Sequence, residues 1–305
     1  MQDIDIVIVG AGVAGLTAAT VAGRHGLKVI VVDRTGVGGQ ISTAERIENF
    51  PGFPQGIAGH ELGPLLHEQA EAAGAEFMLD TIESIEAEDG RFLVRGADTL
   101  RARAVIVAAG STPRQLGIPG EEPFLGKGVS HCASCDGPFF KGQEVVVVGG
   151  GDSGLDEALV LAAHAARVTV VHRGANLHAQ QSIVTRAATD PKVAILLDTV
   201  VEEIVGGDAV TGVRLRDRKS GDVRLQPVKG VFVYVGSEPN TRFLQGFVAL
   251  DGSGHIETDT MMRTSRPGLF AAGDIRKGSV AIIAAVAGDG ATAAVVAARY
   301  LQNGG

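Results

Sequence analysis

The chain has 305 residues, a net charge of −8 and two cysteines, with 45% hydrophobic and 20% charged residues. This length favours two domains, each large enough to bury a core of its own. The acidic balance, without a basic patch interleaved with aromatic residues, argues against a nucleic-acid-binding protein. Two cysteines are too few for a secreted disulfide scaffold.

No targeting signal is predicted at the start of the chain. Met1 leads almost directly into an apolar β-branched segment, with no basic stretch followed by an apolar one. No apolar run reaches the length of about 18 residues that spans a bilayer. We therefore expect a cytoplasmic protein without membrane contacts, in which a CxxC pair is more often catalytic or metal-binding than structural.

The first motif is a glycine-rich loop between two apolar strands. A buried strand is predicted at Ile6–Val9, a helix at about Val13–His25, and a second strand at Lys28–Val32 that ends in Asp33. The loop has the G-x-G-x-x-G pattern, with glycines at Gly10, Gly12 and Gly15. Such glycines let a pyrophosphate approach a helix N-terminus, while the acid accepts a hydrogen bond from ribose. The complete βαβ context predicts a dinucleotide site.

The same unit recurs in the middle of the chain. A strand at residues 145–148 leads into a second glycine loop, a helix follows at about Ser153–Ala165, and a strand at Arg167–Val171 ends in His172. The two units align without a gap, Gly149, Gly151 and Gly154 on Gly10, Gly12 and Gly15, and His172 on Asp33. Two such units predict an α/β protein that uses two dinucleotides.

Further elements follow the same logic. Buried strands that end near glycines are predicted at Ala104–Ala108, Gly230–Val235 and Leu269–Ala272, and an Ala-rich helix at about Ala281–Leu301. Weakly alternating segments are predicted as meander strands at Glu76–Ile85, Arg91–Val94, Ala194–Glu203, Val210–Arg216 and Leu225–Val228. Because ligands bind at the carboxyl ends of strands, the glycines Gly110, Gly236 and Gly273 are candidate cofactor contacts.

Both cysteines lie between the two units, at Cys132 and Cys135. A CxxC at a helix start places both sulfurs within reach of a disulfide, and the helix N-terminus lowers the thiol pKa. Asp136 either moves protons as sulfur leaves or caps a helix, and His131 either tunes the neighbouring thiol or is an exposed loop residue. The alternative is a zinc site, but no second cysteine pair supplies further ligands, so we expect no metal.

Several motifs in this order identify a family. The matching segments are Gly10–Gly15, Val37–Ile41, Ile47–Pro54, Ala108–Pro113, Gly128–Ser130, Cys132–Gly137, Gly149–Gly154 and Phe270–Asp274. Over nearly its whole length the chain resembles the low-molecular-weight thioredoxin reductases. The resemblance implies two Rossmann-like three-layer α/β domains, the second inserted into the first. Residues 1–114 and 244–305 would bind FAD, and residues 115–243 would form an NAD(P)H-type domain that carries the CxxC.

The resemblance also implies a role for each matching residue. On the FAD side, Gly10, Gly12 and Gly15 would hold the pyrophosphate, and Asp33 would bind the adenosine ribose. Gly39, Gln40 and Asn49 would lie near the flavin, and Ala109 and Gly110 would form a second FAD-binding loop. Asp274, after Gly273, would hold the ribityl chain. Cys132 and Cys135 would be the redox pair, with Asp136 as the general acid. The implied protein is a homodimer that reduces thioredoxin or a similar protein.

The second nucleotide unit departs from the family pattern. Of the arginines that grip the 2′-phosphate of NADPH in the family only Arg173 is present, since Gly174 and His178 stand where the others are expected. Asp152 adds a negative charge to the loop of Gly149, Gly151 and Gly154, where the family has Asn. Each lost charge-assisted hydrogen bond would cost about 1.5–3 kcal/mol, which predicts weak NADPH binding.

A second departure lies after Asp274, where Ala281 and Ile282 replace an Arg-Gln pair that faces the flavin in the family. The two departures together suggest that another donor, such as ferredoxin, supplies the electrons. We thus expect an FAD-dependent disulfide reductase. The alternatives are a flavin-dependent dithiol oxidase that uses oxygen, ordinary NADPH use with a relaxed phosphate pocket, and a non-enzymatic redox-sensing protein, against which the intact cysteine pair argues.

Overall fold

The computed structural model describes residues 4–304 and divides the chain into two compact units. Unit 1 comprises Met1–Thr112 with Glu238–Gly305, and unit 2 comprises Pro113–Ser237, so the second unit is an insertion into the first. The predicted boundaries lie at 114/115 and 243/244. The return boundary falls earlier because Asn240 is bound to unit 1: its N–H donates to the Gly110 carbonyl (3.0 Å) and its Nδ2 to the Ala109 carbonyl (2.8 Å).

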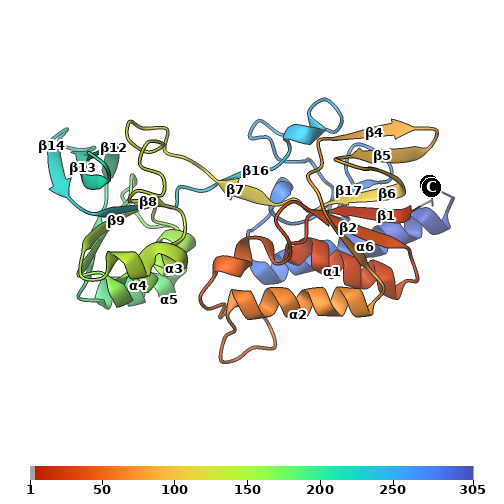
Figure 1. Cartoon of the computed structure of the whole chain (residues 1–305), viewed down its shortest axis with the longest axis horizontal. Coiled ribbons are helices and arrows are strands. Elements are labelled where there is room, and N and C mark those ends of the chain that lie inside the picture. The colour runs from red at the N-terminus through yellow and green to blue at the C-terminus, as the bar shows by residue number, and fades with distance from the viewer. Residues whose placement is uncertain (1–3, 305) are drawn as a thin grey trace. The chain divides into compact units, whose positions relative to one another are not determined.

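Unit 1 is built on a parallel sheet (Figure 1). The parallel strands are β1 (Ile4–Val9), β2 (Val29–Asp33), β3 (Glu76–Leu79), β6 (Thr99–Val107) and β17 (Leu269–Ala271). Val9 at the end of β1 lies opposite Val32 on one side and Val107 on the other. The buried parts of the central strands, residues 6–9 of β1, 29–32 of β2 and 104–107 of β6, are apolar because layers cover both faces of the sheet.

Helices cover one face of this sheet, and antiparallel strands extend it (Figure 1). The helices are α1 (Val13–Arg24), α2 (Gly59–Ala72) and α6 (Ile283–Gln302), and the antiparallel strands are β4 (Ser84–Glu88) and β5 (Arg91–Arg95), which pair with the first half of β6. Helices α1 and α6 pack closely because Gly290 has no Cβ, which would meet the Ala14 carbonyl. The opposite face is closed by a cluster that includes the fully buried Leu244 and Ile256.

Unit 2 has three layers. Its parallel sheet has the order β11-β10-β9-β15-β8, with β8 (Val129–Ser130), β9 (Glu144–Val148), β10 (Arg167–Val171), β11 (Val193–Leu196) and β15 (Gly230–Val233). One side packs on α4 (Asp152–His164), α5 (Gln181–Thr189) and the short helix α3 (Ala133–Asp136). The other side packs on an antiparallel sheet of β12 (Thr199–Gly206), β13 (Val210–Asp217) and β14 (Val223–Pro227). Strands β7 (Ser111–Pro113) and β16 (Ser237–Pro239), at the two crossings between the units, pair with each other.

The expectation of α/β layers is confirmed, and two details differ. The segments predicted only as meander strands at Glu76–Ile85 and Ala194–Glu203 overlap the parallel edge strands β3 and β11. Their edge position leaves every residue of both strands half-buried or exposed, so neither has the buried apolar run of a central strand. Helices α2 and α5 were not predicted. Helix α2 contains Pro64, and α5 buries only Ala187, so neither gives a clear apolar stripe.

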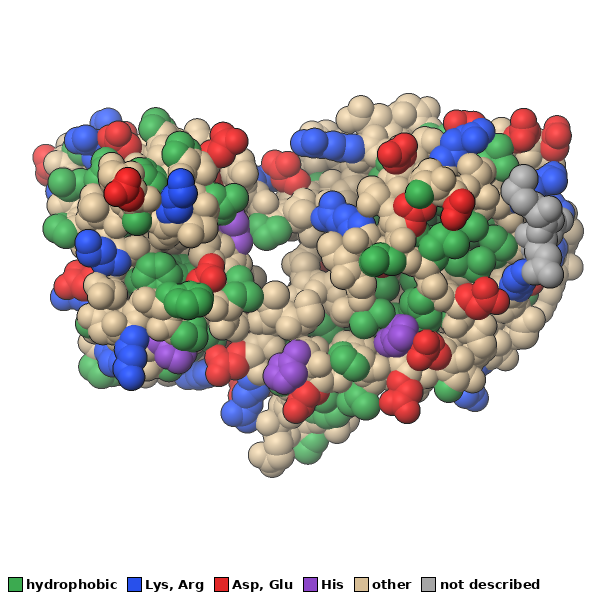
Figure 2. All heavy atoms as spheres, viewed as in Figure 1, with side chains coloured by type: hydrophobic (Ala, Val, Ile, Leu, Met, Phe, Trp, Pro, Cys, Tyr) green, Lys and Arg blue, Asp and Glu red, His purple; other side chains and the backbone are tan. Residues whose placement is uncertain are grey.

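The surface of the described chain carries charges of both signs. Figure 2 shows acidic and basic side chains interspersed over the visible face. Within residues 4–304, no helix has the length and apolar character needed to cross a membrane.

Candidate active site

The first glycine loop, after β1, leaves a helix N-terminus open to a ligand. Gly10 has φ +111°, and a Cβ there would meet the Ala108 carbonyl, while a Cβ on Gly15 would meet the Gly10 carbonyl. At Gly12, by contrast, a Cβ would meet nothing closer than the Gly39 Cα at 4.0 Å. Gly10 and Gly15 are therefore required for packing, whereas Gly12 leaves room for a bound group.

The electrostatics of this loop fit a dinucleotide pyrophosphate. Helix α1 has Gly12 as its N-cap, with no side-chain cap and no acid in its first turn, so its N–H groups and dipole can bind an anion. At the end of β2, Asp33 Oδ2 accepts from the Ala11 N–H (2.7 Å), and Oδ1 accepts from the Thr35 and Gly36 N–H groups. These bonds hold a carboxylate beside the loop, at the position that binds ribose in such folds.

Other predicted FAD residues gather at the same edge of the sheet. The Gly38 N–H donates to the Ala11 carbonyl (2.8 Å), which brings Gly39, at the start of a short 3₁₀ helix, against Gly12. Gln40 Nε2 donates to the backbone and hydroxyl oxygens of Ser111 (2.9 and 3.0 Å).

Ala109 and Gly110 follow β6, and Asn240 binds both of their carbonyls. Asn49 lies apart from them in sequence and is exposed, in a loop at residues 48–54 that lines a shallow pocket of about 360 Å³. Its place beside a flavin stays a prediction.

The end of β17 supplies a half-buried acid. Asp274 Oδ1 accepts from the Ser279 hydroxyl (3.0 Å), and burial raises the pKa of Asp274. The preceding Gly273 N–H donates to Asp289 Oδ2, and Asp289 is only 7% exposed and bound by two nitrogens of Arg276 (2.6 and 2.9 Å). No pattern in the sequence indicates this buried ion pair beside Asp274.

Ala281 and Ile282 lie at the start of α6. Ala281 has φ +50°, a left-handed conformation that is uncommon for a residue other than glycine, and Ile282 is the N-cap. Both side chains are exposed, so this turn presents an apolar surface where the sequence comparison with the family expects an Arg-Gln pair.

Cys132 and Cys135 form a disulfide at the N-terminus of α3, with their Cα atoms 5.4 Å apart. Cys132 is the N-cap of the helix, and its Sγ accepts from the Cys135 N–H (3.2 Å). Cys132 is half-buried and Cys135 is exposed. Within residues 4–304, no group of three or more His, Cys, Asp or Glu residues is placed to hold a metal ion.

Asp136 and His131 flank the two cysteines, and the structure bears on the alternative roles that the sequence left open for each. Asp136 ends α3 and precedes the 3₁₀ helix Gly137–Phe140, but its side chain makes no cap hydrogen bond, which leaves it available for proton transfer. His131 Nδ1 lies 3.1 Å from the Val233 carbonyl. This contact holds the ring against β15, so His131 is more constrained than an exposed loop residue would be.

A tyrosine that the sequence did not indicate supports the disulfide helix. The Ala133 N–H, between the two cysteines, donates to the hydroxyl of Tyr234 (3.0 Å), directly after β15. Burial raises the pKa of Tyr234, as does the nearby carboxylate of Glu157 on α4, to which the hydroxyl is hydrogen-bonded. The backbone of Tyr234 also lies against Gly149, so one residue touches both the disulfide helix and the second glycine loop.

The second glycine loop repeats the packing of the first. A Cβ on Gly149 would meet the Tyr234 carbonyl, and one on Gly154 would lie 2.6 Å from the Gly149 carbonyl. At Gly151 the nearest atom to a Cβ would be the His178 carbonyl at 3.8 Å, so this loop too leaves room at a helix N-terminus.

The electrostatics of this second loop differ from those of the first. Asp152 lies in the first turn of α4, where both of its carboxylate oxygens accept from Gln180, Oδ1 from the backbone N–H (2.6 Å) and Oδ2 from Nε2 (2.9 Å). These bonds fix the acid in place but leave its negative charge at the anion-binding end of the helix.

The end of β10 carries His172 and Arg173. His172 is 9% exposed, its Nε2 has no hydrogen-bond partner, and burial, with the nearby charges of His178 and Arg173, lowers its pKa, against the effect of the Asn176 backbone. Its ring meets that of His178 edge to face, with centroids 5.6 Å apart. Arg173 is exposed at the same strand end.

Comparison with known proteins agrees with this arrangement. Residues 4–298 match the family model described as pyridine nucleotide-disulphide oxidoreductase. A thioredoxin reductase of Listeria monocytogenes is 42% identical over 98% of this chain and 94% of its own length, and one of Treponema pallidum is 42% identical over 99% and 98%. The crystal structure of Lactococcus lactis thioredoxin reductase has a TM-score of 0.96 at 38% identity, with 98% of this chain and 99% of that chain covered.

The chain belongs to the pyridine nucleotide-disulphide oxidoreductase family. It is an oxidoreductase, and its resemblance to the low-molecular-weight thioredoxin reductases is confirmed. Proteins of this family use FAD, with NADPH as the usual electron donor. The first glycine loop and Asp33 fit FAD, which when bound supplies an electron pair for disulfide chemistry.

Proposed function

We propose that this chain is an FAD-dependent disulfide reductase that passes electrons through Cys132 and Cys135 to thioredoxin or a similar protein disulfide. The observation that carries the proposal is the disulfide at the start of α3, in which Cys135 is exposed and is followed directly by the carboxylate of Asp136. Thioredoxin is named because proteins similar over the whole chain are thioredoxin reductases. A homodimer is typical of this family, and we propose one here.

The two cysteines have different roles in this reaction. In the dithiol form, the exposed Cys135 attacks the partner disulfide as a thiolate and releases one partner sulfur, which takes a proton from Asp136. Cys132 then attacks the mixed disulfide, which reforms the Cys132–Cys135 bond and releases the second partner sulfur. The Cys135 N–H, already directed at Cys132 Sγ, stabilises the Cys132 thiolate before that attack.

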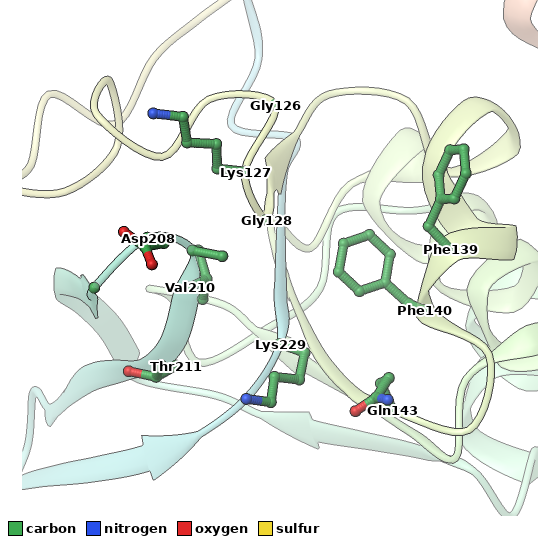
Figure 3. A pocket seen from close by; sticks show the side chains of 12 residues that line it. Gly126, Lys127, Gly128, Phe139, Phe140, Gln143, Asp208, Val210, Thr211 and Lys229 are labelled. Carbon is green, nitrogen blue, oxygen red and sulfur yellow. The ribbon is translucent and has the colours of Figure 1, made fainter.

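The surroundings of the disulfide support a protein partner. Phe139, four residues after Cys135, is 82% exposed, and such an exposed aromatic side chain is typical of a binding surface. It borders a pocket of about 470 Å³ in unit 2, where Phe140, Lys127 and Lys229 also lie (Figure 3). Phe140 packs edge to face on the buried Phe232, with ring centroids 5.3 Å apart, which holds its ring at the pocket wall.

A second candidate concerns the electron donor. Asp152 at the N-terminus of α4 opposes a pyrophosphate, and Gly174 and His178 offer no guanidinium to a 2′-phosphate. These features remove contacts that the family pattern offers to NADPH, so reduced ferredoxin is a second candidate for the electron donor. They would also suit a dithiol oxidase, in which the cysteine pair takes electrons from a substrate dithiol and oxygen is the final acceptor.

An anaerobic reduction assay tests these candidates together. The holoenzyme is mixed with NADPH, NADH or reduced ferredoxin, and flavin bleaching and new thioredoxin thiols are followed. Thioredoxin thiols formed with any of these donors, and lost in C135S, support the reductase. Flavin bleaching without thioredoxin thiols, together with dithiol-dependent oxygen consumption in air, would replace the reductase by the oxidase.

A further inference from the structure

The β13–β14 turn brings a second arginine to the end of β10. Arg218 Nη1 donates to the Arg173 carbonyl at 2.6 Å, although the two residues lie 45 positions apart in the sequence. The turn is docked there by backbone bonds as well: the Arg218 N–H donates to the Asp198 carbonyl (2.7 Å), and the Asp198 N–H donates to the Gly174 carbonyl (3.0 Å). Arg218 is thus part of the same strand end as His172, Arg173 and Gly174.

These two arginines lack the carboxylate partners that their neighbours have. On the same hairpin, Arg214 pairs with Glu203 and Arg216 with Glu202. No carboxylate among residues 4–304 pairs with Arg173 or Arg218. The nearby Asp198 is bound by Lys219, with Nζ 2.6 Å from Oδ2, so its charge is already compensated. The Arg218 guanidinium is held on the Arg173 backbone, and the Arg173 side chain is exposed at the same strand end. This strand end therefore carries positive charge without a paired carboxylate, where an anion can bind.

The position of this pair selects the kind of anion. His172 occupies the position that Asp33 has in the first repeat, where a carboxylate would accept from a free ribose 2′-hydroxyl. Here that side chain is a buried imidazole with an unpartnered Nε2, and burial lowers its pKa. A ribose that carries a 2′-phosphate suits this environment better than one with a free hydroxyl.

We propose that Arg173 and Arg218 together bind the 2′-phosphate of NADPH, with Arg218 in place of the family arginines missing at 174 and 178. One N–H of Arg218 is used on the Arg173 carbonyl, and four of the five donors of a guanidinium remain for a phosphate. The proposal rests on the proposed reductase function, which leaves the electron donor open, and it deepens that function by assigning NADPH as the donor. Binding of the 2′-phosphate by these arginines would offset the repulsion between Asp152 and the pyrophosphate, because the two phosphate groups bind at separate points.

Nucleotide binding to the oxidised holoenzyme tests the proposal without turnover. Dissociation constants for NADP⁺ and NAD⁺ are measured by calorimetry for the wild type, R218A and R216A. R216A is the matched control, since it removes the same charge from the same hairpin at a residue already paired with Glu202. R218A should weaken NADP⁺ binding about tenfold or more and leave NAD⁺ within about twofold, while R216A leaves both unchanged.

Several outcomes would overturn the proposal. Wild-type enzyme that binds NADP⁺ no more tightly than NAD⁺ would do so, as would equal losses in R218A and R216A, or a loss in R218A that NAD⁺ shares. If R218A folds poorly, R218K takes its place, because lysine keeps the positive charge but lacks the planar guanidinium group. The preference of R218K for NADP⁺ over NAD⁺ is expected to lie between that of the wild type and no preference. Selective NADP⁺ loss in R218A, in an enzyme that does not reduce thioredoxin, would leave this site standing and refute the proposed function instead.

Discussion

Replacing Tyr234 by phenylalanine should loosen the helix that carries the disulfide. The substitution keeps the ring but removes the hydroxyl that accepts from the Ala133 N–H at 3.0 Å. Ala133 is 0% exposed, so its N–H gains no water in exchange. Leaving a buried donor without a partner costs about 1–3 kcal/mol, and the Glu157 carboxylate loses a donor in the same step.

Hydrogen exchange measures this loosening directly. At ten-fold per 1.4 kcal/mol, amides around residues 129–140 should exchange about 5-fold to 140-fold faster in Y234F than in the wild type. Y300F is the matched control, because the other tyrosine of the chain packs on Phe270 in unit 1 and its loss should leave these amides unchanged. Unaltered exchange at these residues in Y234F, or the same acceleration in Y300F, would refute the role given to the hydroxyl.

Four further substitutions probe the two nucleotide-type units. G12A has room for its methyl group and should leave the apoprotein within about 0.5 kcal/mol of wild type while FAD content falls, whereas G15A meets the Gly10 carbonyl and should cost at least about 2 kcal/mol in urea unfolding. Burial raises the pKa of Asp274, so the folded state binds the carboxyl proton more tightly than the unfolded state. The stability of the apoprotein relative to D274N should therefore fall as the pH rises from 3.8 through the raised pKa. A stability difference between the two proteins that does not change with pH would contradict the shift. F139A should raise KM for thioredoxin about tenfold and leave flavin reduction unchanged, and equal kinetics with the partner would remove Phe139 from the docking surface.

The sequence was most informative where structure depends on neighbours in the chain. Both glycine loops and the βαβ units around them were predictable because a strand, a turn and a helix N-terminus are local, and glycine is needed where a Cβ would meet a carbonyl, as at Gly15. The disulfide was predictable for the same reason, since Cys132 and Cys135 are separated by one helical turn.

Contacts between distant segments could not be predicted in this way. The loss of arginines at 174 and 178 reads in the sequence as a loss of phosphate binding, because nothing there shows that Arg218 folds back onto Arg173. Tyr234 likewise lies 101 residues from Ala133, and only the pairing of the sheet brings its hydroxyl to the disulfide helix. Both residues follow a strand of an unremarkable apolar or alternating pattern, which carries no functional signal of its own.

The central claim is that Cys132 and Cys135 are the electron carrier between the flavoprotein and its partner. Anaerobic reductive titration of the holoenzyme, followed by addition of oxidised thioredoxin, tests it most directly. The wild type should take up one electron pair for the flavin and a second for the disulfide, and should return electrons to thioredoxin as new thiols. C135S should take up only the flavin pair and form no thioredoxin thiols. Full two-pair uptake by C135S, or thioredoxin reduction without Cys135, would contradict the account.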